Sequence, residues 1–226
     1  MILAAGRGER LAPLTDTLPK PLIKVGQRRL IDYHLDALVA AGVNQVIINV
    51  AHLADQILAH LQDATHDSIK ICFSREPHGA LETGGGICNA LPLIESDPFI
   101  VVNADIWTDY RFSCLPESIT GEAHLVLVPN PAHHPDGDFS LQDGLVLARG
   151  AGASPALTYS GIGVYRSTLF KNCPSDRFTL APLLHKAIAA GTVSGEWYAG
   201  RWMDIGTVER LQVARKQADT LSHGHR

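Results

Sequence analysis

Several features of common protein classes are missing from this chain of 226 residues. Its four cysteines (Cys72, Cys88, Cys114 and Cys173) are widely spaced and form no C-x-x-C pair, which argues against a disulfide framework and a zinc site. No apolar stretch approaches the roughly 20 residues that cross a membrane, and no leader-like segment opens the chain. We therefore expect a cytoplasmic protein with no membrane partner.

An excess of positive charge is also missing, because the formal net charge is -4 at pH 7. This balance argues against a nucleic acid as the main partner. The hydrophobic fraction of 46% is ample for a packed core, and no linker-like stretch or internal repeat divides the sequence. We predict a single domain over residues 1–226.

The segment from Met1 to Lys24 contains the strongest functional signal. A short apolar run, Ile2–Ala5, predicts a buried strand, and a loop with two glycines and two arginines follows it. Glycines let a backbone approach an anion and direct successive N–H groups at it. Arginine and lysine neutralise the remaining charge. The segment therefore predicts a phosphate-binding loop, with Gly6 and Gly8 supplying backbone N–H groups and Arg7, Arg10 and Lys20 supplying positive charge.

Two familiar nucleotide-binding motifs do not fit this loop. The G-x-G-x-x-G fingerprint lacks its third glycine, and Pro13 follows instead. A nicotinamide oxidoreductase would also need an acidic residue at the tip of its second strand, where this chain has Ala51-His52. The Walker A pattern is absent from the segment. The loop reads G-x-G-x-R-L-x-P-x-T, followed by Lys20-Pro21.

Apolar periodicity predicts an α/β fold. In the first half, strands alternate with helices, which is typical of a mostly parallel sheet flanked by helices. The second half is richer in hairpin-like patterns and predicts a small antiparallel part. The predicted strands are 45–50, 69–73, 99–102, 124–128 and 157–165, with a hairpin over 139–147 and a helix over 180–190.

The end of the chain predicts one more strand pair and a helix. Trp197-Tyr198 and Trp202-Met203 flank Gly200, which suggests a small antiparallel pair. The second strand of that pair would deliver Asp204 into Ile205-Gly206-Thr207. Thr207 is expected to cap a final helix.

Two motifs leave their function open when they are considered alone. The apolar strand 99–102 leads to Asp105, and a carboxylate at the tip of a strand can hold Mg²⁺ or cap a turn. The three glycines at 84–86 follow a strand and precede a predicted helix. They indicate either close approach to a ligand or a plain turn.

Four motifs together resemble those of the sugar-1-phosphate nucleotidyltransferases, which join a nucleoside triphosphate to a sugar phosphate. They occur in the order typical of that family: G-R-G-E-R-L-A-P-L-T with Lys20-Pro21, L-E-T-G-G-G-I at 81–87, N-A-D at 103–105, and W-M-D-I-G-T at 202–207. The resemblance implies a Rossmann-like mixed sheet of GT-A-like type, with 1–107 mainly binding nucleotide and 108–226 mainly binding sugar.

The resemblance also implies a role for each matching residue. The nucleotide would be bound by Ala4, Ala5, Gly6, Gly8, Glu9, Arg10, Lys20, Glu82, Thr83, Gly84 and Asn103. The sugar would be bound by Asn103, Gly137, Asp138, Ser160 and Gly161. Mg²⁺, the implied cofactor, would be held by Asp105 and Asp204. The residues implied to act in catalysis are Lys20, Arg10 and Asp105.

Within the family, segments such as NPAHHPDGDF and YSGIGVY are similar to those of N-acetylmuramate-1-phosphate uridylyltransferases. This likeness implies transfer of a uridylyl group from UTP to N-acetylmuramic acid 1-phosphate in cell-wall recycling. Alternatives are a mannose-1-phosphate guanylyltransferase, another sugar-1-phosphate nucleotidyltransferase, or a non-catalytic sugar-nucleotide sensor.

One departure from the family concerns the sugar phosphate. Many relatives have a lysine for it before the strand equivalent to 157–165, and here that region reads ARGAGASPAL. Arg149 is one candidate replacement. The expected partners are small molecules, and the chain is expected to be a monomer or a homodimer.

Overall fold

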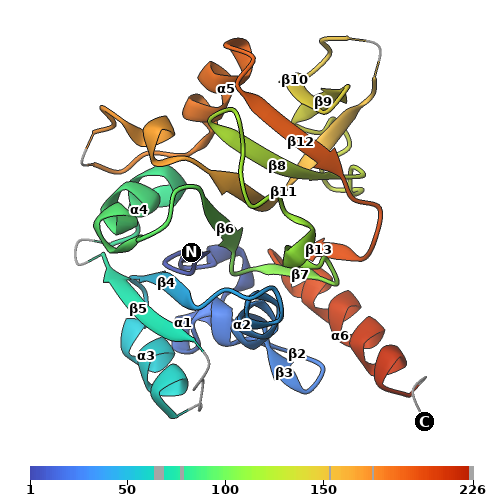
Figure 1. Ribbon diagram of the computed structural model, residues 1–226. Coiled ribbons are helices and arrows are strands. Elements are labelled where there is room, and N and C mark those ends of the chain that lie inside the picture. The colour runs from blue at the N-terminus through green and yellow to red at the C-terminus, as the bar shows by residue number, and fades with distance from the viewer. Residues whose placement is uncertain (64–68, 77–78, 153, 175, 224–226) are drawn as a thin grey trace. The chain divides into compact units, whose positions relative to one another are not determined.

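The computed structural model describes residues 1–63, 69–76, 79–152, 154–174 and 176–223, and the chain forms two compact units (Figure 1). The first unit contains Met1, Leu81–Val102 and Cys114–Gly200, and the second unit contains Ile2–Ala80, Asn103–Ser113 and Arg201–Arg226. Both units therefore combine segments that are distant in sequence.

Parallel strands form the centre of the second unit. Strands β1 (Ile2–Leu3), β4 (Gln45–Val50) and β5 (Lys70–Arg75) pair in the order β5-β4-β1. All of β4 after its first residue is buried, as expected for a parallel strand that is covered on both faces. Helix α2 (Leu30–Ala40) precedes β4, and helix α3 (Ala54–Asp63) connects it to β5. The predicted β-α-β alternation is confirmed here.

The second unit also contains short elements that position polar residues. Strand β7 (Ile106–Thr108) pairs antiparallel with β13 (Trp202–Asp204), and β2 pairs with β3. The final helix, α6, begins after Thr207, whose hydroxyl accepts the backbone N–H of Arg210 at 3.3 Å, which confirms the predicted cap. The remaining bounds are η1 (Glu9–Leu11), α1 (Leu14–Thr17), η2 (Lys20–Leu22), β2 (Lys24–Val25), β3 (Arg28–Arg29), η4 (Phe112–Cys114) and α6 (Val208–His223).

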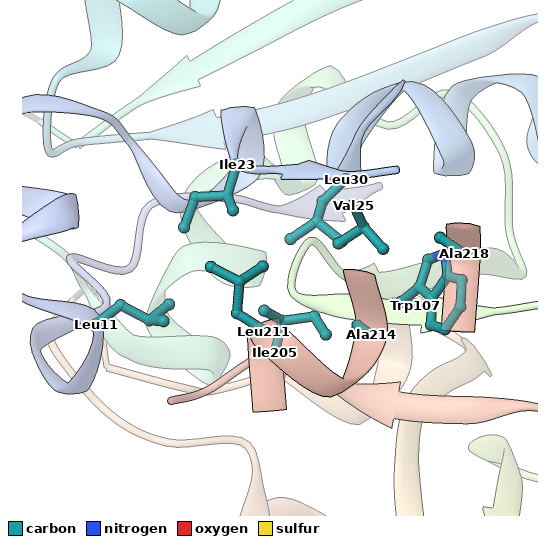
Figure 2. Packing of buried hydrophobic residues seen from close by; sticks show 9 residues of the cluster. All are labelled: Leu11, Ile23, Val25, Leu30, Trp107, Ile205, Leu211, Ala214 and Ala218. Atoms are coloured by element: carbon teal, nitrogen blue, oxygen red, sulfur yellow. The ribbon is translucent and has the colours of Figure 1, made fainter. Parts of the chain in front are cut away.

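A buried hydrophobic cluster ties the start of the chain to its last helix. In Figure 2, side chains of the N-terminal segment face those that follow β13 and those of α6. Burial of each large apolar side chain contributes about 1.5–3 kcal/mol, so this cluster anchors α6 firmly. Its members are Leu11, Ile23, Val25, Leu30, Trp107, Ile205, Leu211, Ala214 and Ala218.

The strands of the first unit are mainly antiparallel. Their order is β6-β11-β8-β12-β10-β9, and only the β12–β8 pair is parallel among the pairings described within this unit. Strand β9 also pairs with β11, which closes a circuit of paired strands. The strands are β6 (Phe99–Asn103), β8 (Ala123–Val128), β9 (Phe139–Gln142), β10 (Leu145–Ala148), β11 (Ala156–Tyr165) and β12 (Val193–Trp197).

Helices of the first unit are short. Helix α5 packs beside β10 and β12, as the periodicity at 180–190 predicts. The predicted hairpin is also confirmed, with its turn at Asp143-Gly144 in left-handed conformation, φ 50° and 77°. The helices are α4 (Glu82–Ala90), η3 (Leu91–Leu93), η5 (Ser167–Phe170) and α5 (Ala181–Ala189). The mixed α/β class is thus confirmed.

Two local predictions are wrong. Trp197 and Trp202 do not lie on paired strands, because β12 pairs with β8 and β10, whereas β13 pairs with β7. Pairing with β7 is favoured because it places Trp107 and Ile205 in the buried cluster.

The glycines 84–86 do not precede a helix but lie inside α4, all of them buried. A side chain at Gly84 would meet the Phe178 ring at 2.3 Å, and one at Gly85 would meet the Asp176 carbonyl at 2.5 Å. Close packing of the helix on a neighbouring segment therefore explains Gly84 and Gly85. The loop before α4 includes residues 77–78, which lie outside the described residues.

Within the described part of the chain, we find no helix whose length and apolar character would let it cross a bilayer.

Candidate active site

The two acidic residues predicted to bind metal lie on neighbouring backbone segments of the second unit. Asp105 follows β6, and Asp204 ends β13, opposite Ile106 of β7 in the antiparallel register. The backbone N–H of Ile205 donates to the Asp105 carbonyl oxygen at 2.8 Å. This strand pairing therefore brings together two acids that are far apart in the sequence.

Each of these carboxylates has its own cation. Lys20 Nζ lies 2.5 Å from Asp105 Oδ2, and Arg210 Nη1 lies 2.5 Å from Asp204 Oδ2. All four side chains are largely shielded from solvent, which strengthens the ion pairs relative to exposed ones. The sequence analysis identified Lys20 but missed Arg210.

The loop predicted to bind phosphate contains one glycine, Gly8, whose backbone conformation favours glycine. Gly8 is left-handed, φ 69°, and a side chain there would lie 3.2 Å from Lys20 Cδ and from Thr15 Cγ2. Thr15 Oγ1 donates to the Gly8 carbonyl at 3.0 Å, which holds the turn. Glu9 and Arg10 follow in η1, and the Arg10 side chain is exposed. The loop therefore presents Lys20 and Arg10 from a fixed turn.

Arg10 and Arg210 border the same small space over Gly206. A Cβ at Gly206 would lie 2.3 Å from Arg210 Nη2 and 3.1 Å from Arg10 Nη2. Among the described residues, Arg10 makes no ion pair or hydrogen bond through its guanidinium. Two guanidinium groups that converge in this way favour the binding of an anion.

The buried cluster holds these polar residues in place through their chain neighbours. Leu11 follows Arg10, Ile205 follows Asp204, and Leu211 follows Arg210, and all three are buried in the cluster (Figure 2). Each functional side chain is thus attached to an anchored backbone, as precise positioning requires.

The predicted base-binding backbone is held by a buried polar chain. The Ala4 N–H donates to Asn49 Oδ1 at 2.7 Å, and Asn49 Nδ2 donates to Glu76 Oε1 at 2.7 Å. Ala4, Ala5, Asn49 and Glu76 are buried, whereas Gly6 is exposed. The sequence analysis missed Asn49 and Glu76. Their only signal is a polar residue within or directly after an apolar strand.

A cavity of about 540 Å³ lies at the carboxyl ends of β4 and β5. Glu76 contributes to its lining, and Arg75 and Asp55 pair at 2.9 Å beside it. The carboxyl ends of parallel strands are the usual place for ligands in open α/β sheets. The lining residues are Val50, Ala51, Leu53, Ala54, Asp55, Gln56, Arg75 and Glu76.

His34 of α2 is a further residue near Asp105 that the sequence analysis missed. Burial lowers the pKa of His34 to about 4, although the charge of Asp105 and a backbone hydrogen bond with Ile106 act to raise it. The imidazole is therefore neutral at pH 7. It contributes no positive charge beside the carboxylate.

The donor set fits Mg²⁺. Magnesium in phosphoryl-transfer sites is held by one or two carboxylates, with substrate phosphates and water completing its shell. Asp105 and Asp204 would supply one carboxylate each from neighbouring backbone segments, and no group of three or more acidic, His or Cys ligands occurs among the residues that the structure describes. A site of this kind suits an ion that arrives with a nucleotide.

In the first unit, the residues predicted to line the base and ribose lie in the first turn of α4. Glu82 is left-handed, φ 62°, and forms an ion pair with Arg177 at 2.5 Å. Thr83 Oγ1 accepts the Leu180 N–H at 2.8 Å, and Gly84 N–H donates to the Phe178 carbonyl. The first turn of α4 is thus held by the segment 177–180.

Four of the five predicted sugar-binding residues lie in the first unit, whereas Asn103, at the end of β6, belongs to the second unit. Asp138 N–H donates to the Leu157 carbonyl at 2.8 Å, and the Tyr159 N–H donates to Asp138 Oδ2 at 2.8 Å. These bonds tie Gly137 and Asp138 to β11, which also contains Ser160 and Gly161. Their roles in sugar binding stay predictions.

The structure also shows where Gly161 and Arg149 lie in the first unit. Gly161 is left-handed, φ 78°, where the β11–β8 register shifts. Arg149 lies exposed after β10. Its suggested contact with the sugar phosphate also stays a prediction.

Comparison with known proteins assigns a family to this arrangement. The family model described as "Nucleotidyl transferase" matches residues 1–137, which include the phosphate-binding loop and Asp105. The chain belongs to this nucleotidyl transferase family. The resemblance predicted from the four motifs is therefore confirmed.

Two relatives match this family member along most of its length. N-acetylmuramate alpha-1-phosphate uridylyltransferase of Neisseria meningitidis is 46% identical and covers 96% of this chain and 97% of its own. The protein of the same name from Caulobacter vibrioides is 37% identical, and the match covers 91% of this chain and 90% of the relative. A mannose-1-phosphate guanyltransferase of Aspergillus fumigatus is 39% identical but covers only 52% of this chain and 33% of its own.

Solved structures support the fold. A putative glucose-1-phosphate thymidylyltransferase from Bacillus anthracis superposes with a TM-score of 0.83 at 18% identity, covering 96% of this chain and 93% of that chain. HddC from Yersinia pseudotuberculosis superposes with a TM-score of 0.79 at 24% identity. At such identities the likeness concerns the fold alone.

Proposed function

We propose that this nucleotidyl transferase moves a uridylyl group from UTP to N-acetylmuramic acid 1-phosphate, with pyrophosphate as the second product. The observation behind the proposal is the paired set of Asp105 with Lys20 and Asp204 with Arg210, next to Arg10. The substrate is inferred from the two relatives that match nearly the whole chain.

The reaction brings together two anions. An oxygen of the sugar 1-phosphate attacks the α-phosphorus of UTP and forms a new P–O bond. The bond to the bridging oxygen of the β-phosphate breaks, and its electron pair leaves with pyrophosphate. The attacking oxygen is already ionised, so no general base is required. Catalysis then depends on positioning and on charge stabilisation.

The chain's own cations are suited to that task. Lys20 extends from a turn held by Gly8 and Thr15, and Arg10 borders Gly206. We assign both to the phosphates, where they reduce the repulsion between nucleophile and leaving group. Mg²⁺, when held by Asp105 and Asp204, would supply further positive charge to the phosphoryl oxygens.

The base and the sugar are assigned to two groups of residues that share Asn103. Backbone of Ala4 to Gly6, fixed through Asn49, would bind the base. Glu82, Thr83 and Gly84 would line the base and ribose, and Asn103 would serve nucleotide and sugar. Gly137, Asp138, Ser160 and Gly161, gathered on β11 and the segment before β9, would contact the sugar.

The proposed setting follows from the chemistry of the substrates. UTP and a muramic acid phosphate are small, water-soluble metabolites, so we place the reaction in the cytoplasm and in the recycling of cell-wall sugars.

The decisive experiment is pyrophosphate release with Mg²⁺ over a grid of substrates. One axis is UTP, dTTP, GTP and CTP, and the other is the 1-phosphates of N-acetylmuramate, N-acetylglucosamine, glucose and mannose. A dominant rate with UTP and N-acetylmuramic acid 1-phosphate supports the proposal. A dominant rate with GTP and mannose 1-phosphate supports the guanylyl alternative suggested by the partial relatives. Binding of UTP without turnover in any pair supports the sensor alternative.

A further inference from the structure

We propose that Arg210 is an additional anion-binding residue of this site, which exchanges Asp204 for a substrate phosphate oxygen. The inference rests on the proposed phosphoryl-transfer function, because it needs a phosphate to arrive at Asp204. Arg210 is not one of the residues that the four motifs predicted to bind substrate or metal.

The position of Arg210 in its helix is the first observation. It lies in the first turn of α6 (Val208–His223), where the helix dipole is positive and a cation is disfavoured. The ion pair with Asp204, at 2.5 Å, offsets that cost in the present arrangement. Without a carboxylate or another anion, the guanidinium would be poorly placed.

The approach of a second guanidinium is the next observation. Arg210 Nη2 and Arg10 Nη2 both border the space over Gly206, and a Cβ there would lie 2.3 Å and 3.1 Å from them. Both guanidinium groups therefore lie close to the same point, and because like charges repel, an anion bound there would stabilise their approach. Phosphate oxygens are suited to that position, because guanidinium groups bind them through paired hydrogen bonds.

The ion pairs show which of the two guanidinium groups already has a carboxylate. Arg210 pairs with Asp204 and Lys20 pairs with Asp105, whereas Arg10 makes no ion pair among the described residues. A divalent cation on Asp204 would release the Arg210 guanidinium, which would then bind a phosphate together with Arg10.

This exchange makes Arg210 a competitor of divalent cations for Asp204 and a ligand of phosphate. The two roles predict opposite effects when its charge is removed. Loss of the guanidinium should strengthen binding of a cation to the empty enzyme and weaken binding of a phosphate. If Arg210 only stabilised α6, its substitution would not strengthen cation binding and weaken phosphate binding at the same time.

The first measurement uses Mn²⁺ as the probe, with neither nucleotide nor sugar present. Free Mn²⁺ is followed by electron paramagnetic resonance during titration of the wild type, Arg210→Gln and Arg210→Lys. We expect Arg210→Gln to bind Mn²⁺ about three- to tenfold more tightly, because one nearby positive charge is removed. Arg210→Lys should stay near the wild type. An unchanged or weakened affinity in Arg210→Gln overturns the proposal.

The second measurement uses inorganic pyrophosphate and then both substrates at saturating Mg²⁺. Arg210→Gln should weaken pyrophosphate binding at least fivefold and raise the KM for either UTP or the sugar 1-phosphate. A raised KM for UTP assigns the guanidinium to the nucleotide, and a raised KM for the sugar 1-phosphate assigns it to the sugar. Unchanged pyrophosphate affinity together with unchanged KM values overturns the proposal.

Arg215→Gln is the matched control. Arg215 lies on the same helix and is exposed, with its Nε donating to the Lys24 carbonyl at 3.0 Å. The substitution removes the same charge and should change neither Mn²⁺ binding nor pyrophosphate binding. If Arg210→Gln folds poorly, Arg210→Lys still tests the phosphate role, because an ammonium cannot reproduce bidentate binding and should raise the affected KM about threefold.

Failure of the proposed function would be seen separately. The wild type would then show no turnover on the substrate grid, whereas the Mn²⁺ and pyrophosphate titrations report on Arg210 without any turnover.

Discussion

Lys20 and Asp105 form an ion pair of 2.5 Å between the phosphate-binding loop and the tip of β6. The two residues were predicted for different partners, Lys20 for the α-phosphate and Asp105 for Mg²⁺. Their contact means that each neutralises the other in this structure. Substrate and metal would replace this pair with two new ones, so both residues should be sensitive to substitution.

Lys20→Ala and Asp105→Ala should each lower kcat for pyrophosphate release by about a hundredfold or more, because each removes a charge from the reacting groups. Circular dichroism should show a folded protein in both cases. Lys24→Ala, an exposed lysine a few residues later, is the control and should keep near-normal turnover. Near-normal activity in Lys20→Ala or Asp105→Ala would contradict the assigned roles.

Asn49→Asp should weaken both the fold and UTP binding. The new carboxylate would face Glu76, which now accepts a hydrogen bond from Asn49 Nδ2 at 2.7 Å. Two buried carboxylates in contact should cost about 2–4 kcal/mol of unfolding free energy. Urea titration measures this cost, and the KM for UTP reports the loss of support for Ala4.

The control for this variant is Asn44→Asp, at an exposed position just before β4. It should change stability by less than about 0.5 kcal/mol. Equal effects of the two substitutions would show that the buried hydrogen bonds of Asn49 are unimportant.

His34 should make stability depend on pH. Its pKa is lowered by burial to about 4 from an ordinary 6.5, so the unfolded chain binds this proton more readily. The free energy of unfolding is therefore not reduced by His34 above pH 6.5, and it decreases as the pH falls from 6.5 toward 4. The total change is about 3 kcal/mol at 1.36 kcal/mol per pKa unit.

The measurement is the free energy of unfolding at several pH values between 7 and about 4, for the wild type and His34→Gln. The difference between their slopes isolates His34 from the carboxylates that also titrate. His133→Gln, an exposed histidine, should keep the wild-type slope. A wild-type slope in His34→Gln would refute the prediction.

Gly137→Ala should destabilise the protein by about 2–4 kcal/mol, because it combines a left-handed backbone with a steric clash. The φ of Gly137 is 64°, and a Cβ would lie 2.6 Å from Asn130 Oδ1 and 2.9 Å from the Leu157 carbonyl. The KM for the sugar 1-phosphate should rise if this segment binds the sugar.

Gly150→Ala separates the two causes. Gly150 is also left-handed, φ 79°, but a Cβ there meets nothing within 4 Å. Its substitution by alanine should lower the free energy of unfolding by only about 1 kcal/mol. Equal costs at the two positions would show that the contacts of Gly137 contribute nothing.

Removal of divalent cations should stop the reaction without unfolding the chain. The proposed ion binds only two carboxylates, each of which already has a protein cation as partner. EDTA should therefore abolish pyrophosphate release and leave circular dichroism unchanged, and added Mg²⁺ should restore the rate. Full activity in EDTA would exclude the Mg²⁺ proposal.

The candidate residues of the loop predicted to bind phosphate could be named from local sequence. Gly8, Arg10 and Lys20 are close in the chain, and the need for a left-handed glycine among cations is a local property. The capping by Thr207 and the turn at Asp143-Gly144 were predictable for the same reason. Apolar runs such as β4 also determined their own burial, because β-branched residues without polar alternation favour a strand covered on both faces.

Tertiary structure decided the rest of the site. Pairing of β13 with β7, rather than with β12, brings Asp204 to Asp105, and no local pattern specifies a partner for so short a strand. The contacts of Arg210 and Asn49 depend on distant parts of the chain that pack against them, and Phe178 leaves no room for a side chain at Gly84. Local spacing and residue type were enough to propose which residues take part in the chemistry. The long-range packing of the buried cluster decided which of them meet.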